Sequence, residues 1–455
     1  MEIMTKKALL ITGQESQTVS TLARNLIHGG GLSIFARQMK QLAAIGVEEI
    51  HLVTDWFAQD FEKEVLNCTA RPDKIFIHST KNAPLKLLEH NNDGNVWFLL
   101  EEGVLLDDRL IEQVANHTSP TLITLIGHNE FLEERTANGI FLHLEACEGY
   151  FGSIAKLSSK TLSANIRKLN SIEGLPNALK AIARAGDCEI LKLIDIPLYV
   201  EKYGRTIDLI WLPLVRREEG DLGTQVLSEY AQNSAQDYVA RYIYHFAERQ
   251  LVKYICKSPV SPIHVITLSS LMGFYVMYLF WAGNIFPALF GSYMVSILYA
   301  MNDKFIHVKR VPLKFERLAH LLAKIIEYGW YLAFATYLST QYGSAASIMA
   351  ITLILFNIAD EGQLEFYRRM AGHRLYYSAQ FDRRFQLIAG RRNTLMWALL
   401  PFVLYDQWYL GLGVLCAYAI VTFFVHQVRV VYHLKNLMIE NSSLFAANFK
   451  NTKIL

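Results

Sequence analysis

Hydrophobic residues are distributed unevenly along the chain: the first half keeps a regular density of charged residues, whereas three long stretches of the second half are almost purely apolar. These stretches are residues 265–301, 328–359 and 394–425. Each is long enough for two helices of the ~20 residues that cross a bilayer, and each is interrupted once by turn-forming residues. The breaks lie at 283–287, 340–343 and 406–408. The pattern predicts six membrane-spanning helices.

Lysines and arginines are concentrated in alternate connections between these predicted spans. The segment before the first span and the connections between the second and third and between the fourth and fifth are rich in cations, while the other connections carry none. By the positive-inside rule, a multi-pass protein of the cytoplasmic membrane with both termini in the cytoplasm is expected. The net charge of +2 gives no indication of a nucleic-acid partner.

Residues 237–257 place aromatic and aliphatic side chains at helical spacing, against several cations. Such an amphipathic helix is expected in the membrane interface, although a linker helix packed on the first domain would show the same pattern. The chain therefore divides into a cytosolic domain (1–234), an interfacial helix (235–258), a six-span domain (259–437) and a C-terminal tail (438–455). The five cysteines form no C-x-x-C pair, so neither a disulfide framework nor a thiolate zinc site is indicated.

The first domain alternates short apolar runs with helical periodicity. Runs rich in β-branched residues at 7–11 and 49–54 flank a helical pattern at 32–44, and further strands are predicted at 96–100 and 122–126. This order predicts an α/β sandwich with a mainly parallel sheet.

The first domain resembles the sugar-phosphate and inositol-phosphate nucleotidyltransferases in residues 29–54 (GGGLSIFARQMKQLAAIGVEEIHLVT) and 99–111 (LLEEGVLLDDRLI). That family binds a nucleoside triphosphate with a glycine-rich loop and a lysine, and a metal ion with an aspartate. Here the loop after the first strand holds one glycine and an acidic residue. The resemblance therefore implies a degenerate site. Its candidate nucleotide or phosphate ligands are Gly13, Arg24, Glu101 and Glu102.

The second half resembles the CDP-alcohol phosphotransferases, including forms fused to a cytidylyltransferase-like domain. The resemblance rests on residues 258–283 (SPVSPIHVITLSSLMGFYVMYLFWAG) and 381–390 (FDRRFQLIAG). It implies an all-α bundle of six transmembrane helices that uses Mg²⁺, a CDP-linked alcohol or alcohol phosphate and a membrane lipid. Members of that family are often homodimers.

The family signature is D-x-x-D-G-x-x-A-R-x8-G-x3-D-x3-D, whose four aspartates hold divalent ions on the CDP pyrophosphate while the last one can deprotonate the alcohol. Aligned without a gap, this chain has other residues at all four aspartate positions. They are Tyr299, Asn302, His320 and Lys324. Because hard Mg²⁺ ions need oxygen ligands, ordinary metal-dependent phosphotransfer is not expected here.

The replacements themselves suggest a different metal site. Asp303 with His307, and Glu316 with His320, are i, i+4 pairs that each share one helix face. Two histidines and two carboxylates suit Zn²⁺ or Mn²⁺ better than Mg²⁺. Two alternatives remain: a cavity that has lost its chemistry and keeps only its packing, or a salt-bridge network that joins Asp303, Glu316 and Lys324 with Arg310.

Arginines near the second and fifth predicted spans are further candidates for binding lipid or substrate phosphates. They are Arg310, Arg383 and Arg384, and they also serve as positive-inside anchors. The acidic residues Asp360, Glu361 and Glu365 are interpreted as a solvated helix end.

Two functions follow from these patterns. The first is a pseudoenzyme of phospholipid head-group biosynthesis that binds a CDP-linked alcohol or a lipid and acts as the partner of an active enzyme. The second is an active transferase with a changed substrate or a His/carboxylate metal site. The substituted site favours the first.

Overall fold

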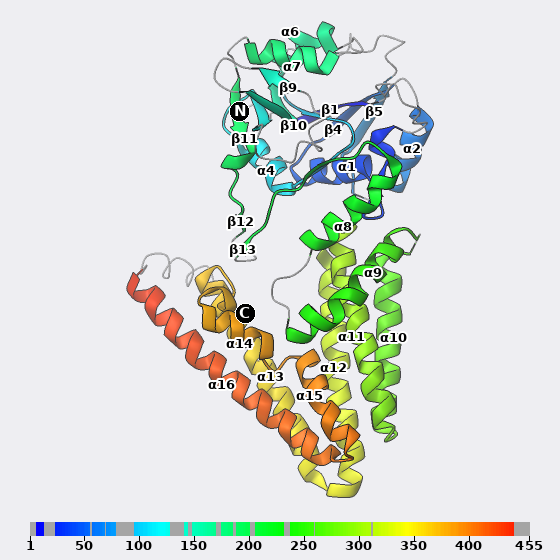
Figure 1. Cartoon of the computed structure of the whole chain (residues 1–455), viewed down its shortest axis with the longest axis vertical. Coiled ribbons are helices and arrows are strands. Elements are labelled where there is room, and N and C mark those ends of the chain that lie inside the picture. The colour runs from blue at the N-terminus through cyan, green and yellow to red at the C-terminus, as the bar shows by residue number, and fades with distance from the viewer. Residues whose placement is uncertain are drawn as a thin grey trace. The chain divides into compact units, whose positions relative to one another are not determined.

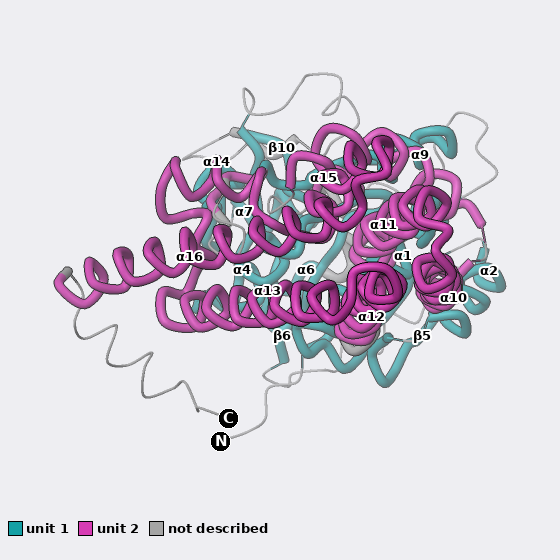
Figure 2. Tube along the Cα trace, turned by 90° about the horizontal axis from the view of Figure 1, so that it is seen from below, with its two compact units in different colours: residues 1–198, 208–227 teal, residues 199–207, 228–455 magenta. Residues whose placement is uncertain are grey.

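The computed structural model describes residues 6–12, 23–54, 57–68, 70–78, 95–127, 141–143, 148–169, 174–184, 188–200, 205–231, 237–258, 260–310 and 313–440. The chain forms two compact units, drawn in different colours in Figure 2. Unit 1 comprises residues 1–198 and 208–227, and unit 2 comprises residues 199–207 and 228–455.

Unit 1 is built on a mixed, eight-stranded sheet (Figure 1). Its strands are β11 (Glu189–Lys192), β8 (Leu122–Ile126), β10 (Glu148–Ser158), β6 (Val96–Leu100), β1 (Lys6–Thr12), β4 (Glu49–Thr54) and β5 (Lys74–His78), in this spatial order, with β9 (Phe141–His143) paired to β10. Strands β6, β1, β4 and β5 run parallel to one another, as β11 does to β8. Strand β10 is antiparallel to both of its neighbours. The predicted α/β class and the mainly parallel sheet are both confirmed, because β10 is the one strand of this sheet that runs against the others among the described residues.

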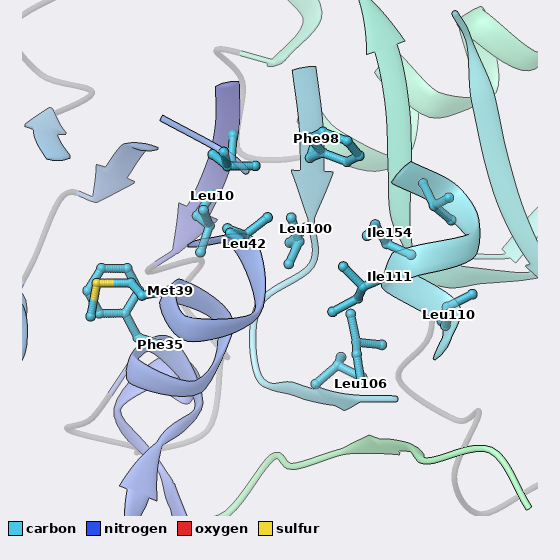
Figure 3. Packing of buried hydrophobic residues seen from close by; sticks show 14 of the residues in the cluster. Leu10, Phe35, Met39, Leu42, Phe98, Leu100, Leu106, Leu110, Ile111 and Ile154 are labelled. Carbon is cyan, nitrogen blue, oxygen red and sulfur yellow. The ribbon is translucent and has the colours of Figure 1, made fainter. Parts of the chain in front are cut away.

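Helices cover both faces of this sheet. One face carries α1 (Ile34–Ala44), α2 (Ala58–Asn67) and α4 (Asp108–Asn116), and the other carries α6 (Ser159–Leu169) and α7 (Gly174–Arg184). Figure 3 shows Leu42 of α1 close to Leu10 of β1 and Leu100 of β6 in the larger core. Helix α1 begins where the Ser33 hydroxyl accepts a hydrogen bond from the Ala36 N–H, which satisfies an end group that the helix leaves unpaired.

Shorter strand pairs lie outside this sheet, and one of them, formed by residues 199–200 and 205–206, is assigned to unit 2. They are β2 (His28–Gly29) with β3 (Leu32–Ser33), β7 (Val104–Leu106) with β14 (Trp211–Pro213), and β12 (Tyr199–Val200) with β13 (Arg205–Thr206). Helix α8 (Gly220–Tyr230) follows them in the sequence.

Unit 2 is helical. Its long helices are α10 (Pro262–Trp281), α11 (Ile285–Val308), α12 (Leu313–Tyr342), α13 (Ser344–Ala371), α15 (Arg392–Leu404) and α16 (Trp408–Glu440). The turns between α10 and α11, α12 and α13, and α15 and α16 fall at the three predicted breaks. Helices α13 and α16 run side by side over much of their length (Figure 1).

Four of these helices, within the part of the chain that the structure describes, are long and apolar enough to cross a membrane: α10, α11, α13 and α16. Helix α15 has only 13 residues, and the first half of α12 is charged. The prediction of a membrane protein is therefore supported, while the expected six spans reduce to four that meet this criterion.

Two shorter pieces flank the bundle. A π-helix at Val239–Tyr244 continues into α9 (His245–Cys256), and α14 (Gln380–Ile388) precedes α15. Tyr242 and Phe246 are mostly exposed, as an amphipathic helix requires. The predicted interfacial location of this segment stays a prediction.

Gly273 of α10 allows close packing against α12. A Cβ atom at this position would lie 2.7 Å from a methyl carbon of Ile326 on α12. At the same place the Trp330 indole N–H donates to the Gly273 carbonyl oxygen over 2.8 Å. The side chains of α12 therefore pack directly on the backbone of α10.

Candidate functional site

A polar cavity of about 640 Å³ lies within unit 2 and is bordered by α11, α12, α13 and the start of α15. Charged side chains of both signs line it. The acids are Asp237, Asp303, Glu327, Asp360, Glu361 and Glu365, and the bases are Lys304, Lys324, Arg374, Arg391 and Arg392. Charged groups in an apolar bundle are costly unless they are paired or bind a ligand, so this cavity is the candidate site.

The four residues that the sequence resemblance singled out all border this cavity. Tyr299 and Asn302 lie one turn apart on α11, and His320 and Lys324 lie one turn apart on α12. Asn302 is 1% exposed, and its Oδ1 has no hydrogen-bond partner among the described residues. These residues, which come from two different helices, therefore border the same cavity.

Lys324 is held between two carboxylates. Its ammonium contacts Glu361 of α13, and it donates over 3.2 Å to Oε2 of Glu327 on its own helix. The other Glu327 oxygen accepts from the Tyr331 hydroxyl over 3.3 Å. These are not the partners expected for Lys324, because the alternative salt-bridge network joined it to Asp303 and Glu316. Glu361, which was interpreted as part of a solvated helix end, was not expected to contact Lys324, because it lies on a different helix.

The acids of α13 are not simply a solvated helix end, since all three border the cavity. The Asp360 carboxylate lies 2.8 Å from Nδ1 of His426 on α16 and also accepts from the Gln363 amide. Glu365 forms ion pairs with Arg368 and Arg369, at 2.7 and 2.9 Å.

The start of α15 supplies a cationic wall. The Arg392 guanidinium lies over the Tyr299 ring, 5.1 Å from its centre, in a cation–π arrangement. The Arg392 Nε has no hydrogen-bond partner among the described residues. Beside it, the Asn393 amide donates to Asp237 over 2.9 Å, and Asp237 in turn accepts from the Ala240 N–H.

A buried ion pair connects α9 to α11. The Lys304 ammonium lies 2.6 Å from Oε2 of Glu248, and the two side chains are 3% and 0% exposed. Lys304 borders the cavity, whereas Glu248 lies behind it. From the sequence, Lys304 is one of the cations used in the positive-inside prediction, and no role in a site was predicted for it.

The structure brings the predicted metal ligands together only in part. Asp303 and His320 border the cavity, whereas His307 does not, and its Nδ1 lies 2.9 Å from the Asp303 backbone oxygen. The Glu316 side chain lies outside what the structure describes. Among the described residues, no three or more His, Cys, Asp or Glu side chains are grouped to hold a metal ion. The zinc or manganese site stays a prediction.

The other arginines predicted to bind phosphates lie elsewhere. Arg310 follows α11 with a positive φ of 52°, and Arg383 and Arg384 are exposed on α14. None of the three borders the cavity. On the opposite side of α14, Asp382 is held by Arg429 at 2.6 Å and by His433 at 2.7 Å.

The predicted nucleotide site of unit 1 contains a carboxyl that is already bound within the protein. Gly13 lies outside the described residues. Glu101 accepts from the Ser153 hydroxyl over 2.7 Å, and burial raises the pKa of this carboxyl to about 7. Glu102 accepts from the backbone N–H of Arg24 over 2.9 Å. Both side chains therefore hold neighbouring segments of the chain by hydrogen bonds at the end of β6.

No family model and no curated protein matches this sequence. Among solved structures, the chain is similar to the inositol-1-phosphate CTP transferase from T. maritima, with 12% identity and a TM-score of 0.35, over 50% of this chain and 98% of that one. It is also similar to HddC from Yersinia pseudotuberculosis, with 14% identity and a TM-score of 0.28, over 35% of this chain and 80% of that one. At this level of similarity, function has to be argued from the residues of the chain itself.

Proposed function

We propose that the protein acts in phospholipid head-group biosynthesis as a membrane-embedded binding or partner subunit. In this proposal the cavity of unit 2 binds a phosphate-bearing alcohol: a CDP-linked alcohol, an alcohol phosphate or the head group of a membrane lipid. The observation that carries the proposal is that Tyr299, Asn302, His320 and Lys324 border one cavity together with Arg392.

Phosphate recognition is assigned to the α15 wall. An arginine guanidinium presents planar N–H groups that match phosphate oxygens, and it keeps its charge in a partly buried site. Arg392 is held over Tyr299, which fixes its plane, and its Nε has no partner among the described residues. Lys324, in contrast, already has two carboxylate partners. Arg392 is therefore the cation best placed to meet an anionic ligand.

A binding role is favoured over catalysis by what stands at the family's aspartate positions. Tyr299 and Asn302 carry no charge, and Lys324 is a cation engaged by Glu327 and Glu361. The reaction of that family needs a general base for the alcohol and carboxylate ligands for the metal ions. The proposed partner is an active enzyme, or a second copy of this chain.

Ligand binding by the purified protein in nanodiscs tests this proposal. Arg392→Met is expected to weaken binding of a CDP-linked alcohol by about tenfold or more, since a charge-assisted contact is lost. Arg249→Met is the matched control, because Arg249 is an exposed arginine of unit 2 paired with Glu229 at 3.6 Å. Equal affinities in the wild type and Arg392→Met would remove the cavity from consideration as the phosphate site.

The second candidate function, an active transferase, is favoured by one observation: Asp303 and the histidine His320 border the same cavity. A histidine can accept the proton of an attacking alcohol. Membranes incubated with a CDP-linked alcohol and candidate acceptors would then release CMP, and His320→Ala would abolish that release. If protein that binds the ligand releases no CMP, the transferase function is refuted and the partner role is kept.

A further inference from the structure

We propose that the Lys324 ammonium is a tethered cation that stands in for a divalent metal ion, so that the cavity holds its ligand without a metal. The ligand in this statement rests on the proposed function, whereas the placement of charge rests on the geometry of the cavity alone.

The geometry places one lysine charge between carboxylates from two helices. Glu361 reaches the ammonium from α13 and Glu327 reaches it from α12. Glu327 is 3% exposed at its side chain, so it cannot rely on water for neutralisation. The ring of Tyr328 lies 5.8 Å from the same ammonium. A lysine ammonium is a compact point charge with three donors, and it can bridge two carboxylates as a small metal ion does.

The donor set of the cavity does not suit Mg²⁺. Octahedral Mg²⁺ is usually bound by one or two carboxylates that face it together. The only two acids of the cavity that share one partner are Glu327 and Glu361 among the described residues, and that partner is Lys324. Asp360 is engaged instead by His426.

Space for a ligand remains next to this built-in charge. Asn302 borders the cavity and is almost fully buried, and its Oδ1 has no hydrogen-bond partner among the described residues. A buried polar atom without a partner is costly, so a small shift of this side chain toward a polar ligand atom in the cavity would be favourable. Ligand atoms would contact Asn302, Arg392 and the ion pairs of Lys324 with Glu327 and Glu361. The charge of the site would come from protein side chains alone.

Removing the tethered cation should create a metal site. Lys324→Met keeps the length of the side chain but leaves Glu327 and Glu361 unneutralised. We expect purified Lys324→Met protein to bind one Mn²⁺ per chain, measured by electron paramagnetic resonance in detergent without any organic ligand. The Kd for Mn²⁺ should be at least about tenfold lower than in the wild type. The double variant Lys324→Met/Glu361→Gln should lose this gain, and Lys324→Arg should not show it.

Opposite outcomes are equally clear. Folded Lys324→Met protein that binds no more Mn²⁺ than the wild type would overturn the proposal. The proposal would also be overturned if the wild-type protein bound one Mn²⁺ per chain and Glu361→Gln lost this binding. This second test does not require Lys324→Met to fold. Because no CDP-linked compound enters these measurements, their failure is distinct from failure of the proposed ligand.

Discussion

The buried pair of Lys304 and Glu248 gives the sharpest test of how the cavity wall is built. Both side chains are almost completely removed from solvent, and the two charged atoms lie 2.6 Å apart. Lys304→Met leaves the Glu248 carboxylate buried without its cation. Removing one partner of such a pair costs about 3–5 kcal/mol. The lower end, about 3 kcal/mol, is taken as the minimum loss expected for this variant.

The expected loss can be read from unfolding in detergent micelles. For a unit of this size, about 3 kcal/mol corresponds to a fall in Tm of about 6–12 °C, followed by tryptophan fluorescence. The double variant Lys304→Met/Glu248→Met is the decisive control. It replaces the pair by apolar side chains of similar length, which is often neutral or stabilising, so it should recover to within about 1 kcal/mol of the wild type.

Two results would refute this reasoning. One is a Lys304→Met variant that unfolds at the wild-type temperature, because the pair would then contribute nothing. The other is a double variant whose loss equals the sum of the two single losses, because the two side chains would then act independently.

Three further predictions concern other parts of the chain. Burial raises the pKa of Glu101 from its ordinary 4.5 to about 7, so the folded state binds this proton more tightly than the unfolded state does. The free energy of unfolding should therefore fall as the pH rises from about 4.5 to 7. Chemical denaturation over a pH series should show this slope, and Glu101→Gln should flatten it. Asp382→Asn should accelerate amide hydrogen exchange in α14, whereas Arg384→Gln on the exposed side of the same helix should leave it unchanged. If the positive-inside prediction is right, a membrane-impermeant thiol reagent should label Asp406→Cys in intact cells but Arg384→Cys only after permeabilisation, each compared with the unsubstituted protein; the reverse pattern would invert the topology.

The parts of the fold that local patterns determine were predictable from the sequence. The bounds of β4, β6 and β8 coincide with the predicted strands, and the turns of the helical unit fall at the predicted breaks. These features depend on hydrophobic periodicity and on turn residues within a few positions of one another, which a single sequence displays directly.

Strand β10 was missed because its glycines resemble strand breakers. A Cβ atom at Gly149 would lie 2.4 Å from the Ile126 carbonyl oxygen, and one at Gly152 would lie 2.5 Å from the Thr124 hydroxyl. Ser153 has a φ of +66°, at the point where the register against β8 shifts. The glycines thus permit close approach to β8 at a bulge. That requirement arises from a strand distant in the sequence, so no local pattern reveals it.

The charge balance of the cavity was not predicted. The signature of the family that the sequence resembles singled out Tyr299, Asn302, His320 and Lys324, which all border the cavity, whereas the partners of Lys324 and Asp360 depend on how α12, α13 and α16 pack. A helix-end acid and a cavity acid have the same sequence pattern. Only the fold shows that Glu361 meets a lysine 37 positions earlier in the chain.

The pairing of charges around the cavity also constrains what the cavity can bind. Glu361 and Glu327 share Lys324, Asp360 faces His426, and Lys304 is neutralised from behind by Glu248. A ligand that displaced Glu248 from Lys304 would have to replace a buried charge interaction of several kcal/mol, whereas the Lys324–Glu361 contact is partly exposed and contributes less. An anionic ligand is therefore bound most readily by a cation that can accept it without breaking a pair. Arg392 meets this condition, because it borders the cavity, is stacked on Tyr299 and forms no ion pair with the described residues, and so the α15 wall rather than Lys324 should determine phosphate affinity.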